Sequence, residues 1–186
     1  MFKSYKKIMV SIFVFIIMLA ILMGVYHFYK QYFVNQPLSV TLDNSDFIAD
    51  YTIVEEGEKP VLRLELNKTR NLQHDFLDFL HNSQKLIEEK SLTVEITTRP
   101  NESLLTMYQQ IHPAVYEALE IGNYTSLQDR LQKINKELIL TRAELAITDD
   151  FLLLQLEDGD AYLYCVFNKG ENSTPKILNV IGSGKA

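Results

Sequence analysis

Three side chains that can bind a metal ion follow one another at helical spacing. His74, Asp78 and His81 stand at positions i, i+4 and i+7, so a single helix would present them on one face as ligands for a divalent metal ion. At about 100° per residue, that face points almost opposite the apolar stripe of the same helix. A catalytic metal ion needs a sheltered pocket, which an outward helix face does not provide by itself. We therefore predict neither a metal ion nor a cofactor, and these three residues are the candidates if a metal ion does bind.

Two acidic clusters have the oxygen atoms that Ca²⁺ prefers. Asp149-Asp150 and Glu157-Asp158-Gly159-Asp160 stand at the two ends of one apolar run. If that run is an extended strand, the clusters are about 20 Å apart at about 3.3 Å per residue and cannot share one ion. We interpret both clusters as turns, and Asp158-Gly159 between two apolar runs predicts a β-hairpin.

The remaining residues with catalytic chemistry do not form a recognisable motif. Cys165 stands within an apolar run, where a buried thiol is expected. The phosphate-loop pattern around Gly182 to Lys185 lacks its first glycine and its Ser or Thr. His112, directly before Pro113, is the one histidine whose setting suggests a recessed site, as an anchored hydrolase would need. We therefore predict that the protein is not an enzyme.

The charge of the chain is unevenly distributed. The chain has 186 residues, a net charge of −6 and a single cysteine, which excludes an intrachain disulfide. Residues 1–30 contain four lysines and no acidic residue, whereas the rest contains 14 Lys and Arg against 24 Asp and Glu, a net charge of −10. Such an acidic surface disfavours nucleic acid as a partner.

The first thirty residues have the pattern of a membrane anchor. From Ile8 to Tyr26, only Ser11 and Gly24 are not apolar, and a helix of this length spans about 28 Å, close to the thickness of a bilayer's hydrocarbon core. A cleaved signal peptide is the alternative, but its apolar run is shorter and ends in a small-x-small site. We predict an uncleaved transmembrane helix at residues 8–29 in the cell membrane.

The flanking charges predict the orientation of this single-pass protein. Lysines precede the apolar run, so the positive-inside rule leaves residues 1–7 in the cytoplasm and the C-terminal part outside. Ala20 and Gly24 have the small-xxx-small spacing that lets two transmembrane helices pack, which suggests a homodimer.

The remainder of the chain predicts one extracytoplasmic α+β domain. We expect a stalk at residues 30–50, the domain at 51–181 and a flexible tail at 182–186, with a mostly antiparallel sheet packed on one side by two or three helices. A ferredoxin-like sandwich and a cystatin- or NTF2-like cone both fit this pattern. Period-two alternation predicts strands at 61–66 and 92–97, and apolar runs bounded by turn residues predict strands at 51–54, 145–148, 151–156, 161–167 and 177–181. A 3.6-residue periodicity predicts helices at 71–90, 101–121 and 125–138.

These observations favour an anchored protein that presents an acidic domain for contact with another protein of a bacterial envelope. The aromatic strand Tyr162 to Phe167 and an uncovered sheet edge at 177–181 are the expected partner surfaces. The alternatives are a ligand-sensing module, which would need an apolar pocket, and an anchored hydrolase, which would need a buried titratable pair.

Overall fold

A computed structural model describes residues 2–29, 42, 45–56, 59–89, 91–170 and 174–181. The chain divides into two compact units, Met1–Asp43 and Asn44–Ala186. Most of the expected stalk, residues 30–41 and 43–44, and the expected tail at 182–186 lie outside the described residues.

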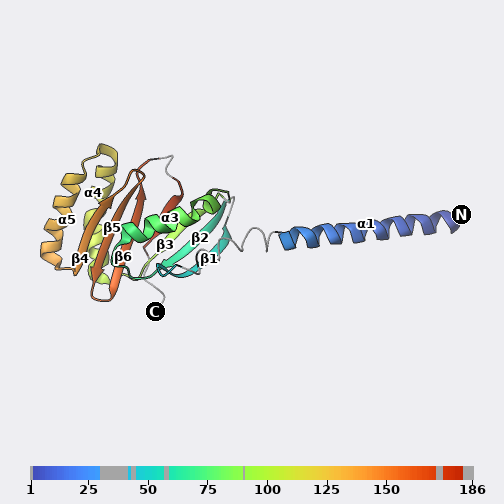
Figure 1. The fold of residues 1–186 in the computed structure, drawn as a ribbon, viewed down its shortest axis with the longest axis horizontal. Coiled ribbons are helices and arrows are strands. Elements are labelled where there is room, and N and C mark those ends of the chain that lie inside the picture. The colour runs from blue at the N-terminus through green and yellow to red at the C-terminus, as the bar shows by residue number, and fades with distance from the viewer. Residues whose placement is uncertain are drawn as a thin grey trace. The chain divides into compact units, whose positions relative to one another are not determined.

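In the first unit, the structure describes the long helix α1 (Phe2–Tyr29), drawn in blue in Figure 1. Its large apolar side chains from Ile12 to Tyr26 are all exposed. The expected transmembrane segment at residues 8–29 coincides with this helix, but within the described part of the chain no helix has both the length and the apolar character needed to cross a membrane.

Two sheets form the second unit. The first contains β1 (Ile48–Glu56), β2 (Lys59–Leu66), β3 (Thr93–Thr97) and β7 (Lys176–Val180) in that order, and the second contains β4 (Arg142–Ile147), β5 (Phe151–Asp158) and β6 (Ala161–Asn168). The second sheet is wholly antiparallel, but in the first β2 pairs parallel with β3 and β3 parallel with β7. The α+β class is therefore confirmed, with one mixed and one antiparallel sheet. The parallel pairing follows because a helix, and not a hairpin, connects β2 to β3.

Three helices accompany the sheets, and their ends are set by local sequence. These are α3 (Leu72–Glu89), α4 (Glu102–Ile121) and α5 (Tyr124–Leu138). The Asn101 side chain caps α4 by accepting from the Leu104 N–H, and Gly122 ends that helix in the left-handed conformation. α4 continues through Pro113, as its unbroken apolar stripe predicts.

The start of α5 differs from the prediction. The predicted helix begins at Thr125, but Asn123 is the cap, and its side chain accepts from the Ser126 N–H at 3.2 Å. The helix therefore begins at Tyr124. Asparagine is as favourable a cap as threonine or better, so the earlier residue takes the role.

The helices cover both faces of the three-stranded sheet, not one face as expected (Figure 1). On one face, α4 and α5 pack with Leu152 and Leu154 of β5 in a common core. On the other, Phe76 of α3 meets the ring of Phe151 edge to face, with centroids 5.4 Å apart. Successive strand residues point to opposite faces, so the mostly apolar residues of β5 and β6 are buried from both sides.

Side chains of two asparagines join the two sheets. Asn179 of β7 bonds both backbone groups of Val166 in β6, and Asn168 of β6 accepts from the Ile177 N–H at 3.0 Å. As expected, β7 stands at the edge of its sheet, but these asparagine side chains connect that edge to β6. The residues of the other expected partner surface, Tyr162 to Phe167, are buried.

Candidate functional site

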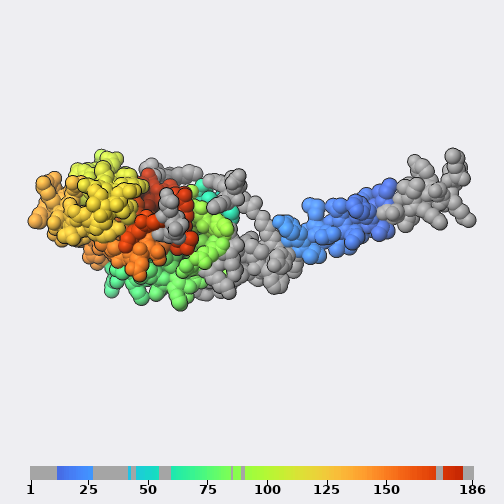
Figure 2. Space-filling view, turned by 90° about the horizontal axis from the view of Figure 1, so that it is seen from above, coloured from blue at the N-terminus to red at the C-terminus, as the bar shows by residue number. Residues whose placement is uncertain are grey.

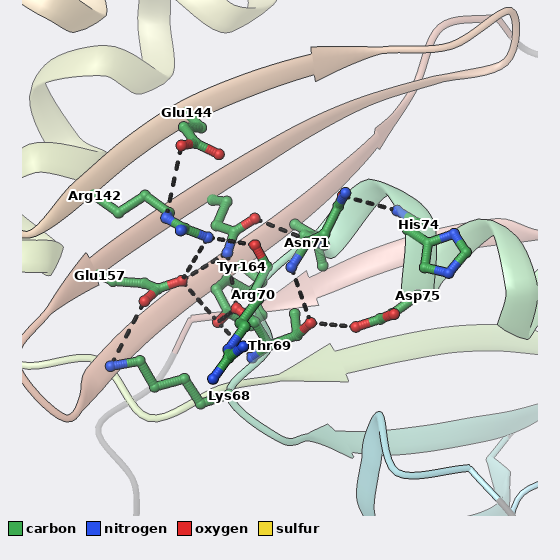
Figure 3. Close-up of polar contacts among 12 residues, drawn as sticks. Lys68, Thr69, Arg70, Asn71, His74, Asp75, Arg142, Glu144, Glu157 and Tyr164 are labelled. Carbon is green, nitrogen blue, oxygen red and sulfur yellow. Dashed lines mark hydrogen bonds and ion pairs between the residues drawn. The ribbon is translucent and has the colours of Figure 1, made fainter.

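A charged side chain, Glu157 of β5, is buried with only 6% of its surface exposed. Its Oε1 accepts hydrogen bonds from Gln155 Nε2 at 2.6 Å and from Tyr164 Oη at 3.3 Å. Arg142 Nη1 lies 3.7 Å from Oε1, and Lys68 Nζ lies 3.6 Å from Oε2. Figure 3 shows these two cations reaching Glu157 from different elements. A buried carboxylate is tolerated because it is paired and hydrogen-bonded in this way.

The same cluster fixes the segment that leads into α3. Gln155 Oε1 accepts from the Leu72 N–H at 3.0 Å, and its Nε2 donates to the Thr69 carbonyl at 3.0 Å. The Thr69 N–H donates to Tyr164 Oη at 3.0 Å, and Arg142 donates to the Arg70 carbonyl. The backbone of residues 69–72 is thus held against the sheet by side chains of β4, β5 and β6.

The burial and the hydrogen bonds of the Glu157 cluster indicate that it stabilises the fold. Burial raises the pKa of Tyr164, the Thr69 backbone lowers it in part, and the nearby Glu157 charge raises it further, so the phenol is neutral at physiological pH. The sequence interpretation of Glu157 as a turn residue was wrong. The sequence feature that could have indicated this role is the spacing of Gln155 and Glu157, two polar residues that stand two positions apart in a mostly apolar strand. Tyr164 of β6 pairs opposite Gln155.

A polar groove lies beside this cluster, along the outer side of β4. It has a volume of about 420 Å³. Its lining comes from β4 and β5, from Gln128 of α5, and from the segment that precedes and begins α3: Arg70, Asn71, Leu72, Gln73, Arg142, Glu144, Leu145, Ala146, Leu153 and Gln155. We call it the β4 groove.

A second groove, of about 390 Å³, lies between α4 and the strands β6 and β7. The ring of His112 lies between those of Tyr108 and Tyr116, with both centroid distances 4.8 Å, and Tyr116 meets Phe167 edge to face at 6.2 Å. Leu178 of β7 lines the opposite side. Figure 2 shows α4 (yellow) next to β7 (red) on this surface. We call this the aromatic groove.

His112 is half-buried here, as its position before Pro113 suggested. Its ring contacts those of Tyr108 and Tyr116, and no carboxylate within the described residues forms an ion pair with it. Burial raises the pKa of the adjacent Tyr108 well above its usual value. The arrangement suits ring stacking and apolar contact better than proton transfer.

The three candidate metal ligands predicted from the sequence all lie on α3 and are exposed. His74 Nε2 lies 3.5 Å from Asp78 Oδ2, and both side chains are about two-thirds exposed, while His81 is also exposed. Among the residues that the structure describes, no three His, Cys, Asp or Glu side chains form a group that holds a metal ion.

The remaining candidates also have other roles or positions. Asp158 accepts from Asn101 Nδ2 at 2.7 Å, away from Asp149 and Asp150 at the other end of β5. Cys165 is fully buried, as expected, and burial raises the pKa of its thiol. The Gly182 to Lys185 pattern lies outside the described residues.

No family model, curated protein or solved structure matches the chain. The function must therefore be argued from the grooves themselves.

Proposed function

We propose that this protein is a membrane-anchored binding domain, not an enzyme, which holds another protein of the cell envelope through the aromatic groove. The observation that carries the proposal is the pair of apolar side chains left open on the two sides of the groove. Tyr116 of α4 is 52% exposed and Leu178 of β7 is 42% exposed.

Several features of the groove favour an apolar or aromatic side chain of a partner protein. Tyr108, His112 and Tyr116 support one another by ring contacts, so little side-chain entropy remains to be lost when a partner binds. Aromatic anchors in a concave site contribute strongly to protein interfaces. The tyrosine hydroxyl groups add polar contacts at the edge of an apolar surface.

The membrane anchor is supported by the sequence. The apolar run begins at Ile8 and extends to Tyr26, with three lysines before it and one, Lys30, after it. The exposed apolar side chains of α1 from Ile12 to Tyr26 are consistent with an apolar surrounding. On this proposal the N-terminus is cytoplasmic and the acidic domain lies outside the cell.

A ligand-sensing module is the second candidate function, and the volume of the aromatic groove favours it. At about 390 Å³, the groove falls within the range of small-molecule sites, which span roughly 300–1,000 Å³. A planar apolar compound would stack on the same rings that we assign to a protein side chain.

Crosslinking in intact cells tests the proposal and separates the two functions. A photoreactive amino acid at Tyr116 is expected to capture a defined second protein in the membrane fraction, while the same amino acid at exposed Lys133 of α5 does not. Equal labelling from the two positions would contradict a protein partner at the groove. If Tyr116→Ala abolishes binding of a small apolar compound but no protein is captured, the sensing module is the better description.

The anchor has its own test. We expect the full chain to remain in the membrane pellet after a wash at alkaline pH. We also expect protease added to cells whose outer layer has been permeabilised to cut the C-terminal domain. Recovery of the intact chain without detergent would contradict the anchor.

A further inference from the structure

The outer side of β4 is a free strand edge within the described residues. β4 is the last strand of its sheet and pairs only with β5. The Thr148 N–H donates to the Phe151 carbonyl at 2.8 Å, at the turn between the two strands. Because bonded and non-bonded pairs alternate along an antiparallel ladder, the N–H and C=O groups of Ala143, Leu145 and Ile147 point away from β5.

The β4 groove runs along this same edge. Gln128 of α5 lines it from one face of the sheet and Arg70 to Gln73 line it from the other. Between them lie the lining residues of β4, which are Arg142, Glu144, Leu145 and Ala146. A free edge at the floor of a groove is the geometry that accepts an extended peptide as an added strand. The walls would receive the alternate side chains of such a peptide.

The lining of the groove has a charge opposite to that of the domain. Arg70 and Arg142 carry two positive charges against one negative charge on Glu144, and the other polar lining residues are amides. Arg142 is held by the Arg70 carbonyl and lies 3.7 Å from Glu157. Arg70 is exposed, and no carboxylate within the described residues forms an ion pair with it.

We propose that the β4 groove is a second binding site, which takes an extended segment of a partner protein as a fourth strand beside β4, with an acidic side chain of that segment next to Arg70. Backbone hydrogen bonds to Ala143, Leu145 and Ile147 supply the attachment, and the side chain facing Arg70 supplies selectivity. A second copy of this chain is a poorer occupant, because it would bring its own Gln128 and Arg70 walls into the same space. The site is separate from the aromatic groove and does not depend on it.

Short synthetic peptides are the probes. One alternates valine with glutamate, one alternates valine with lysine, and a third is the glutamate peptide with alternate backbone N–H groups methylated. Each is titrated against the full-length protein in detergent by fluorescence anisotropy. We expect the glutamate peptide to bind best, the lysine peptide about tenfold more weakly, and the methylated peptide not at all.

The variant Arg70→Glu tests the proposed charge contact. It should weaken binding of the glutamate peptide about tenfold and improve binding of the lysine peptide, whereas Lys133→Glu, a matched reversal on an exposed part of α5, should change neither. Circular dichroism checks that both variants fold. Equal binding of the two charged peptides to the natural protein would overturn the proposed selectivity without the need for any variant.

Hydrogen exchange locates the added strand. The amides of Ala143, Leu145 and Ile147 should exchange at least about tenfold more slowly when the glutamate peptide is bound. Protection elsewhere, or no protection, would overturn the proposal. Protection of these three amides in the protein alone, increasing with its concentration, would also overturn it, because a second copy would then occupy the edge.

Discussion

The side-chain amide of Asn179 forms two hydrogen bonds with the backbone of Val166. It accepts from the Val166 N–H at 2.8 Å and donates to the Val166 carbonyl at 2.9 Å. A single side chain thus replaces a neighbouring strand at the boundary between the two sheets, and it satisfies backbone groups that would otherwise be costly to bury.

Substitution of Asn179 should therefore weaken the contact between the sheets. We expect Asn179→Leu to lower the free energy of unfolding by about 2–3 kcal/mol, since both Val166 groups lose their partners. Urea denaturation measures this change. The control is Asn82→Leu, because the Asn82 side chain is exposed and bonds only within α3; its effect should stay within about 0.5 kcal/mol. Equal effects of the two substitutions would show that the double hydrogen bond does not stabilise the domain.

The carboxylate of Glu157 should contribute more to the free energy of unfolding than that of its exposed neighbour Glu144. Glu157→Leu removes the partner of Arg142, Lys68, Gln155 and Tyr164, and we expect a loss of about 3 kcal/mol in the free energy of unfolding. Glu144→Leu is the control, since Glu144 is 63% exposed and lies 3.6 Å from Arg142 Nε, and its loss should be below about 1 kcal/mol. Thermal and urea denaturation both report the difference, and a loss as small as that of Glu144→Leu would contradict the structural role of the cluster.

The stability of the domain should fall at alkaline pH. Burial raises the pKa of Tyr164 in the folded protein above its ordinary value of 10.0, so above about pH 10 the unfolded chain loses this proton while the folded chain keeps it. The unfolded state then binds fewer protons, and the free energy of unfolding decreases as pH rises, by up to about 1.4 kcal/mol per pH unit for this group. Below about pH 9 the tyrosine contributes no slope.

Denaturation measured from pH 8 to pH 11 checks this expectation. Tyr164→Phe removes the phenol proton, so its stability should decline less steeply than that of the natural protein above pH 10. Parallel curves for the two proteins would mean that Tyr164 ionises equally in the folded and unfolded states.

Ile139 should be replaceable by glycine with a gain in stability. It ends α5 with φ of +54°, a conformation that is unfavourable for a β-branched residue, and its side chain is 81% exposed. We expect Ile139→Gly to raise the free energy of unfolding by about 1 kcal/mol, because glycine adopts this conformation without strain. Ile139→Val keeps the β-branch and should have little effect. A loss of stability on Ile139→Gly would show that Ile139 makes a stabilising contact despite its exposure.

Local sequence was sufficient to predict those strands, turns and helices whose conformation depends on a few adjacent residues. Alternation of Leu62, Leu64 and Leu66 predicted β2, and Asp158-Gly159 predicted the β5–β6 hairpin, in which Gly159 has φ of +59°. The helix predicted at 101–121 matches α4, and Asn101 and Gly122 cap its two ends. In each case the periodicity or the backbone preference of a few adjacent residues determines the outcome.

Tertiary structure decided which surfaces are free. The strand at 177–181 stands at the edge of its sheet, yet Asn179 connects it to β6 by a contact between residues 13 positions apart that no local pattern encodes. Glu157 and Arg142 meet because β4 pairs with β5 in one register, and the aromatic groove exists because α4 packs next to β7. The sequence determined the elements and the charge of the chain, since these depend on residue type and spacing. Pairing and packing of distant elements determined the grooves, because only the folded chain brings their walls together.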